Sequence, residues 1–280
     1  MYADRRSLCG ALLLCVSISG PTPASSAAPA QQVSHSGAVA AGVEIEIYNL
    51  SGSVQVTGWD RNEVAVEGGL GAGAERLDFA NDGDRVEIRV VVPRARRGDS
   101  PPREVDESHL RIMVPGSAAL EIETLAASIT VTGVSGPLSM ASSAGSISYS
   151  GDAAAIEAES AGGDVHVETT STRADIDVEG IAGNIVVQLA GGKVDASSVT
   201  GGLRILGRVD EGRFESVSGS MYFEGSISTE FGHEGSRADP YSPEQEAEFT
   251  LGDGNRARVS VETFSGNVRV RQLGPTRSRP

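Results

Sequence analysis

The sequence contains two cysteines, Cys9 and Cys15, and both lie close to its N-terminus. If that segment is removed on export, the rest of the chain has no thiol. This excludes disulfides, thiolate metal sites and a cysteine nucleophile. Aromatic residues make up 4% of the chain, with a single tryptophan. Large rings need a wide interior, so their scarcity favours a fold built from thin layers.

Positive charge is also scarce. The chain has one lysine, Lys193, and a net charge of −15. Removal of residues 1–28 takes away Asp4, Arg5 and Arg6, so the net charge becomes −16. Nucleic acid is therefore excluded as a partner, because phosphate contacts need clustered positive charge.

One apolar run, Leu8–Ile18, stands out near the N-terminus, after Arg5 and Arg6. It is followed by Ser26-Ala27-Ala28, which suits a signal-peptidase site. We predict a signal peptide over residues 1–28, and an uncleaved anchor is the alternative. The run is shorter than the roughly 20 residues of a comfortable membrane span. We expect an exported protein of the periplasm or cell surface, with no membrane span in the mature chain.

A short phrase recurs eight times: a small residue, then usually Ser, Asp or Asn, then an apolar–polar–apolar alternation. Between positions 127 and 219 the steps are close to 18 residues. A constant period of this length with strand-type alternation is typical of a solenoid. The small residues that open the phrases are Gly52, Ala127, Gly145, Gly163, Gly183, Gly201, Gly219 and Gly266.

Alignment on the small residue predicts two short strands per coil. Apolar residues recur seven and five positions before it, and two and four positions after it, so each strand has one inward face. Val165 and Ile185 are examples of inward residues. At one coil the inward position is Gly212, and we expect the ring of Phe214 to fill the gap. Three positions before the small residue, most coils have a hydroxyl that can bond backbone groups at the corner.

The predicted fold is all-β: a single-domain parallel β-solenoid (β-helix) of about 18 residues per coil, over residues 42–271. Residues 57–119 lack the tight period, and we expect broader strands there that start the stack. A polar insertion with two prolines predicts a loop over 229–247. Residues 29–41 are expected to be a flexible mature N-terminus, and residues 272–280 a disordered tail.

Several segments resemble a bacterial family of β-strand-repeat proteins, the domain of unknown function numbered 4097, whose members are often labelled adhesins. The matching pieces are Gly58-Trp59, Leu110–Pro115 leading into Leu120–Thr124, and Val259–Val270. The resemblance covers residues 40–271. It implies a β-helical fold and an adhesive role, and it supplies no catalytic residues.

The most conspicuous polar feature is a stripe of acids in the outward positions of the first strands. Stacked strands lie about 4.8 Å apart, so like charges recur at close range along one face. Either this is a solvated face that keeps long sheets soluble, or it binds cations loosely through oxygen ligands. The candidates for loose cation binding are Glu121, Glu123, Glu157, Glu159, Asp177 and Glu179.

The sequence contains no pattern typical of an enzyme. The four histidines lack a metal-binding spacing, and neither a nucleophile elbow nor a phosphate-binding loop is present. We predict no catalytic residues, no cofactor and no enzymatic activity. The favoured function is that of an adhesin-like protein or interaction scaffold, with an envelope protein or a surface glycan as partner. The alternative is a carbohydrate-binding or polysaccharide-lyase-like β-helix protein.

Overall fold

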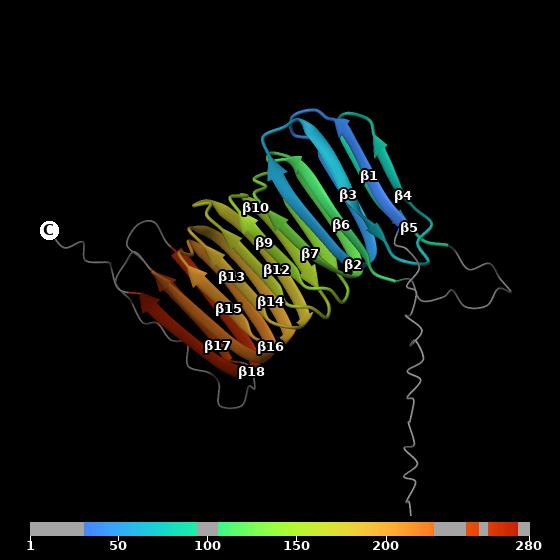
Figure 1. Ribbon diagram of the computed structural model, residues 1–280. Coiled ribbons are helices and arrows are strands. Elements are labelled where there is room, and N and C mark those ends of the chain that lie inside the picture. Colours follow the sequence, from blue (N-terminus) through green and yellow to red (C-terminus); the bar gives the residue numbers. More distant parts are fainter. Residues whose placement is uncertain (1–30, 94–105, 227–244, 252–256, 274–280) are drawn as a thin grey trace, which may run out of the picture.

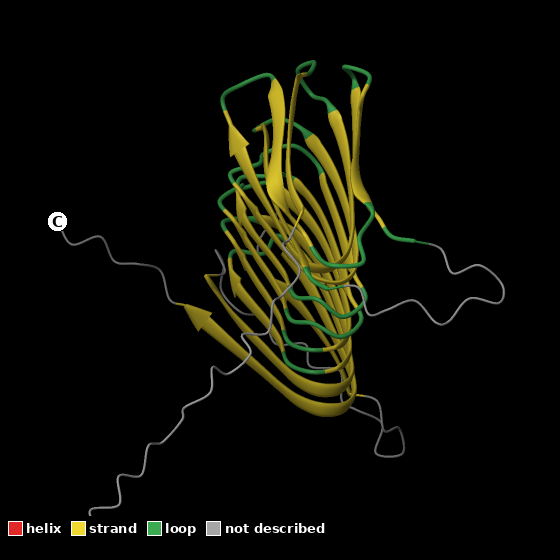
Figure 2. Ribbon diagram, turned by 45° about the vertical axis from the view of Figure 1, so that its right-hand side comes forward, coloured by secondary structure: helices red, strands yellow, loops and turns green. Residues whose placement is uncertain are grey.

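The computed structural model describes residues 31–93, 106–226, 245–251 and 257–273. Within these residues every regular element is a strand, and none is a helix (Figure 2). The strands form one large sheet that runs from the N-terminal elements at one end to β17 and β18 at the other (Figure 1). The all-β prediction is confirmed.

The pairings divide into two ladders, because each repeat has one strand before its corner and one strand after it. The first ladder has parallel neighbours from β5 to β18 and an antiparallel strand at each end. Its order is β4 (Arg76–Asn81), β5 (Arg85–Val91), β2 (Glu44–Trp59), β7 (Ala119–Thr132), β8 (Leu138–Ser142), β10 (Ala155–Ser160), β12 (Ala174–Ala182), β14 (Gly192–Thr200), β16 (Glu211–Ser226), β18 (Ala257–Leu273) and β17 (Gln245–Leu251).

The second ladder starts with two antiparallel pairings and continues with parallel ones. The long strands β2, β7, β16 and β18 belong to both ladders, because they bend through the corner without a break. The order of the second ladder is β1 (Gln31–Ala38), β3 (Glu63–Leu70), β6 (Ser108–Pro115), β2, β7, β9 (Ile147–Gly151), β11 (Val165–Thr169), β13 (Ile185–Leu189), β15 (Leu203–Gly207), β16 and β18.

The bends of β7 and β16 connect the two ladders into a closed ring of hydrogen-bonded strands. From β7 the pairings run through β8, β10, β12 and β14 to β16, and return through β15, β13, β11 and β9. The core is the space between the two ladders. It is filled by the alternate side chains that each strand turns inward.

The register is the one that the repeat alignment predicts. Ile45 pairs with Leu120, Leu120 with Leu138, and Leu138 with Ile156. On the second ladder Ile147, Val165 and Ile185 are in register, and each is 1% exposed. A Cβ at Gly212 would lie 2.7 Å from Cζ of Phe214, so the phenyl ring occupies the gap that the glycine leaves, as predicted.

Buried hydroxyls follow one corner of the stack. The Ser142 hydroxyl accepts a hydrogen bond from Gly145 N at 2.9 Å, and Ser160 accepts one from Gly163 N at 2.9 Å. Thr124 donates to the carbonyl of Ala127 at 2.9 Å. These contacts confirm the predicted role in the first coils. Beyond Gly180, where a coil has no hydroxyl, three buried hydroxyl oxygens have no hydrogen-bond partner among the residues that the structure describes: those of Ser198, Ser216 and Thr263.

Glycine at the corner allows adjacent coils to approach closely. Gly201 has φ +139°, in the region that favours glycine, and a Cβ there would lie 1.9 Å from the carbonyl oxygen of Gly183. A side chain at this position would force the two coils apart. The repeated small residue is therefore a requirement of the stacking itself.

The N-terminal section, where broader strands were predicted over 57–119, has mixed pairings, and residues 57–59 still belong to β2. The pairs β1–β3, β3–β6 and β4–β5 are antiparallel, whereas β5 and β6 each pair parallel with β2. The two outermost strands of this section meet: the rings of His35 on β1 and Phe79 on β4 stack at 5.6 Å, and Asn81 Nδ2 donates to the carbonyl of Ala38 at 3.1 Å. These contacts link the ends of the two ladders.

Three segment predictions differ from the structure. Residues 31–38, expected within the flexible stretch 29–41, form β1, because their backbone pairs along the whole edge of β3. Residues 245–247 of the predicted loop 229–247 belong to β17, which pairs antiparallel with β18. Gln272 and Leu273 of the predicted tail continue β18 beside β16. The signal peptide 1–28, residues 229–244 and residues 274–280 lie outside the described residues.

Candidate functional site

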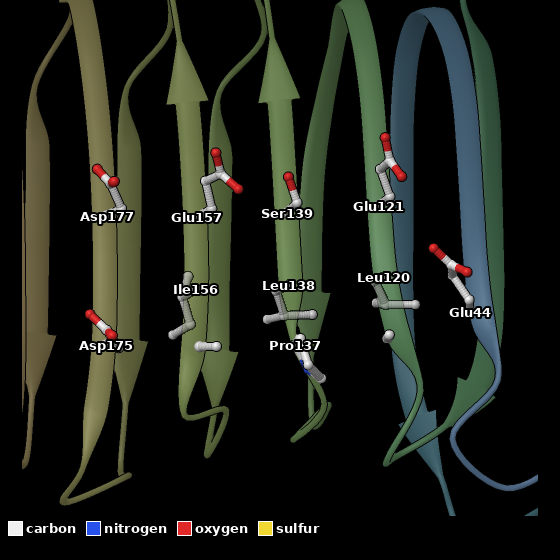
Figure 3. Close-up of a pocket in the computed structure, with 12 residues that line it drawn as sticks. Glu44, Leu120, Glu121, Pro137, Leu138, Ser139, Ile156, Glu157, Asp175 and Asp177 are labelled. Atoms are coloured by element: carbon white, nitrogen blue, oxygen red, sulfur yellow. The ribbon is translucent and has the colours of Figure 1, made fainter.

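An open groove runs across the outer face of the first ladder, near the start of its strands. It has a volume of about 570 Å³. In Figure 3 the side chains of Glu121, Glu157 and Asp177 stand above a line of apolar residues that includes Leu120, Leu138 and Ile156, and Asp175 lies at the level of that line. The groove crosses β2, β7, β8, β10 and β12, so each strand contributes at equivalent positions. Its acidic lining residues are Glu44, Glu121, Glu157, Asp175 and Asp177.

The six predicted acids fall into two columns that follow the stack. Glu121, Glu157 and Asp177 belong to the first column and line the groove, while Glu123, Glu159 and Glu179 belong to the second, two residues further along the same strands. On β8 the two columns carry Ser139 and Ala141 instead. The stripe is therefore interrupted at β8, with Glu87, Glu46 and Glu121 adjacent on one side of the break and Glu157, Asp177 and Asp195 on the other.

Two acids of the groove were not among the predicted candidates. Glu44 and Asp175 lie two positions before the first column on their strands, eight positions before the small residue of the repeat. The same alignment that identified the inward residues contains this signal. Aligning the outward residues at the strand starts in the same way identifies both acids.

At one end of the groove Glu44, Glu46 and Glu121 come close together, with one ligand atom of each within 4.8 Å of the others. Glu46 is 7% exposed, and its carboxylate accepts a hydrogen bond from Arg85 Nη2. The guanidinium of Arg85 therefore already supplies positive charge to this cluster. A cation that bound there would have to share the Glu46 carboxylate with it.

Two acids in the middle of the first column, Asp177 and Asp195, have raised pKa values. Partial desolvation raises the pKa of Asp177, and the carboxylates of Glu157 and Asp175 raise it further. The pKa of Asp195 is raised by desolvation and by Asp177, against the opposing effect of Arg213. These shifts mean that the folded stack holds its negative charges at a cost, and that a cation would relieve it.

Three basic side chains near the stripe have acidic partners. Lys193 Nζ lies 3.2 Å from Glu211 Oε2, and Arg213 Nε donates to Glu215 Oε1 at 2.6 Å. Arg208 Nη2 lies 3.0 Å from Asp210 Oδ1. The guanidinium of Arg204 instead lies 5.2 Å from the ring centroid of Tyr222. These cations lie at different positions of the coil and do not converge.

The three described histidines lie on separate elements. His35 stacks on Phe79, the Nδ1 of His109 lies 2.9 Å from the Ser53 hydroxyl, and His166 is exposed between Ser148 and Val186 in its ladder. His233 is outside the described residues. The structure thus brings none of the described three together, and it places the predicted acids, in contrast, on one face.

No family model matches the sequence, and no curated protein matches it. Membership of family 4097 therefore stays a prediction. The solved structures include three bacterial proteins described as proposed adhesins or cell adhesion proteins. The alignment with each of them covers 87% of this chain.

The protein from Bacteroides fragilis is 13% identical, with 97% of its own chain covered and a TM-score of 0.47. The proteins from Clostridium sporogenes and Parabacteroides merdae are 9% and 7% identical, with 100% and 96% covered and TM-scores of 0.32 and 0.26. Because all three TM-scores are below 0.5, these likenesses support no functional assignment. The proposed function rests on the groove and the ladders. Within the described residues, no helix has the length and apolar character to cross a membrane.

Proposed function

We propose that this chain is an exported, non-enzymatic protein of the bacterial cell envelope that acts by contact, as an adhesin-like protein or interaction scaffold built on a parallel β-solenoid. The observation that carries the proposal is the acidic groove. Its residues come from five neighbouring strands in one register, and four of these strands, β2, β7, β10 and β12, contribute carboxylates, while β8 contributes Ser139.

A recurring array of this kind suits a partner that also presents recurring groups. The carboxylates of Glu157 and Asp177 stand on hydrogen-bonded strands, about 4.8 Å apart. Because the groove is open, the partner can lie along it without entering a closed pocket. The raised pKa of Asp177 indicates that positive charge on the partner would be favourable there. An envelope protein or a surface glycan with basic groups meets these requirements.

The charges of the groove argue against the alternative of a lyase acting on acidic polysaccharide. A polyanion would be repelled by the rim of carboxylates. A lyase also needs a base and charge stabilisers gathered on one face. Here three basic residues on strands beside the acidic columns, Lys193, Arg213 and Arg85, are paired with Glu211, Glu215 and Glu46.

Antibodies against the purified protein test the location on intact cells, before and after the envelope is permeabilised. We expect labelling of intact or permeabilised cells, with a cytoplasmic marker staying unlabelled until lysis. Confinement to the cytosol would overturn the proposal.

Contact through the groove is tested with a variant that combines Glu121→Gln, Glu157→Gln and Asp177→Asn. We expect weaker retention of the protein on isolated envelope fractions. The matched control is Glu168→Gln on the second ladder, where the register neighbours are the neutral Ser150 and Gln188. Equal loss in both variants would show that general charge, not the groove, governs retention.

A further inference from the structure

Large apolar side chains are exposed at one position of the coil, two residues before the small residue of the corner. The exposed fractions are 54% for Leu125, 55% for Ile181, 42% for Val199 and 51% for Val217. The last three are called the corner ridge below. A contiguous exposed apolar surface, unlike a single exposed side chain, indicates an interaction site.

The three residues of the corner ridge stand on consecutive strands of the stack. Gly180 pairs with Ser198, and Ser198 with Ser216, while Ala182 pairs with Thr200, and Thr200 with Ser218. The residues between these pairs are Ile181, Val199 and Val217, so they follow one another at intervals of about 4.8 Å.

The fold itself does not require apolar side chains there. Ser143 and Ala161 occupy the same position on the two coils that precede the ridge. The first of these is polar and the second is a single methyl group, yet their coils stack in the same register. Leu125 is consequently separated from the ridge by two coils with small residues.

One side of the ridge is acidic. Glu179 and Glu215 precede Ile181 and Val217 by two residues on the same strands, and Glu159 pairs with Glu179 on the neighbouring coil. Thr200 and Ser218 lie on the other side of the ridge. The equivalent residue on β14 is Ser197, and Glu215 accepts a hydrogen bond from Arg213, so the negative charge beside the ridge is concentrated at Glu159 and Glu179.

We propose that the corner ridge is a docking site for an amphipathic α-helix of a partner protein, with basic residues along one border of its apolar face. One helical turn advances 5.4 Å, close to the 4.8 Å step between coils, so successive turns place one apolar side chain beside each ridge residue. Over three coils the mismatch stays near 1 Å. The basic border then faces Glu159 and Glu179.

A second copy of this chain fits the ridge less well. A stable dimer buries about 800 Å² on each partner, and three side chains supply far less than that. Two ridges in contact would also bring the acidic rows of both copies together. The inference rests on the proposed contact function and deepens it, because it names the class of partner.

A synthetic probe tests the site directly: an 18-residue peptide of leucine and lysine, with the leucines on one helical face and a fluorescent label. Binding to the purified protein is measured by anisotropy at physiological ionic strength. We expect the triple variant Ile181→Ser, Val199→Ser and Val217→Ser to bind at least about tenfold more weakly, because three apolar contacts are lost. Leu125→Ser, at the same corner position, should bind as the wild type does.

A peptide of the same composition with leucines and lysines scrambled measures simple charge attraction. Equal binding of the two peptides, or unchanged binding by the triple variant, would overturn the proposal. A wild-type dimer that becomes monomeric in the triple variant, seen by sedimentation, would assign the ridge to a second copy instead. If the triple variant fails to fold, Val199→Ser alone is measured, with the same criterion. Because the assay uses purified protein, it can succeed even if the envelope location proves wrong.

Discussion

The hydroxyl of Tyr149 donates a hydrogen bond to the carbonyl of Val134, at 2.7 Å, and so joins two successive coils at the corner opposite the one that the buried serine and threonine hydroxyls follow. The same oxygen accepts a hydrogen bond from the backbone N–H of Ala153, at 2.7 Å. Tyr149 is fully buried, so water cannot replace either contact. One side chain thus satisfies two backbone groups inside the stack.

Replacing Tyr149 by Phe should lower the free energy of unfolding by about 1–3 kcal/mol, because the carbonyl of Val134 and the N–H of Ala153 lose a buried partner. Urea unfolding measures the change. Tyr222→Phe is the control, since Tyr222 bonds Glu224 on the outer face, where water is available. A Tyr149 variant as stable as the control would mean that this corner is open to solvent.

Replacing Val165 by Asp should unfold the central coils, because a buried, unpaired carboxylate costs several kcal/mol. Val165 lies between Ile147 and Ile185 in the second ladder. Circular dichroism with thermal melting measures the loss. The neighbour His166 points outward, so His166→Ala should melt as the wild type does. Equal melting of all three proteins would show that the inward and outward faces are assigned wrongly.

We expect the acidic column to make the protein more stable in mild acid than at neutral pH. The folded-state pKa values of Asp177 and Asp195 are raised, so the folded state binds protons more tightly than the unfolded chain. The contribution is therefore fully present below the ordinary carboxyl pKa and is lost as the pH rises through the raised values. Melting temperatures across this range measure it.

Asp177→Asn should remove most of this pH dependence and raise the melting temperature at neutral pH. Added salt should narrow the difference by screening the repulsion. Glu168→Gln should leave the profile unchanged, since no acid adjoins it in its ladder. A profile that stays the same in Asp177→Asn would mean that other groups cause the dependence.

Loose calcium binding along Glu121, Glu123, Glu157, Glu159, Asp177 and Glu179 stays a proposal, and calorimetry at low ionic strength measures it. The carboxylates are exposed or half-buried, so we expect affinities no better than about 10⁻³ M. Glu157→Gln combined with Asp177→Asn should abolish the heat. A signal of the same size in that variant would place the calcium elsewhere. With no heat at all in the wild type, the acids serve solubility.

The repeat alignment predicted the register of the central coils because each inward position is fixed by burial. A shift of one residue would turn Ile156 and Val165 to solvent. The same logic could not find β1 or β17, because both are antiparallel additions outside the repeat, and pairing with a distant strand leaves no period in the sequence.

The candidate site was predicted in part for a related reason. Charged residues such as Glu157 and Asp177 could be assigned to one face from their offsets. The pairing of Glu46 with Arg85 could not, since β5 lies outside the repeat and reaches β2 through a long excursion of the chain. The corner ridge could not be predicted, because a single apolar residue at a turn does not indicate an apolar surface. The surface becomes evident only when three coils are stacked.

The excursion through β3 to β6 has a consequence for the order of assembly. Adjacent central coils join residues 18 apart, as at Thr124 and Ser142, whereas β2 meets β7 through pairs about 75 residues apart, as at Ile45 and Leu120. Closing the longer loop costs more chain entropy, and contacts remote in sequence form more slowly. The central coils can therefore form one after another before the N-terminal strands have paired. The stack then grows from its middle.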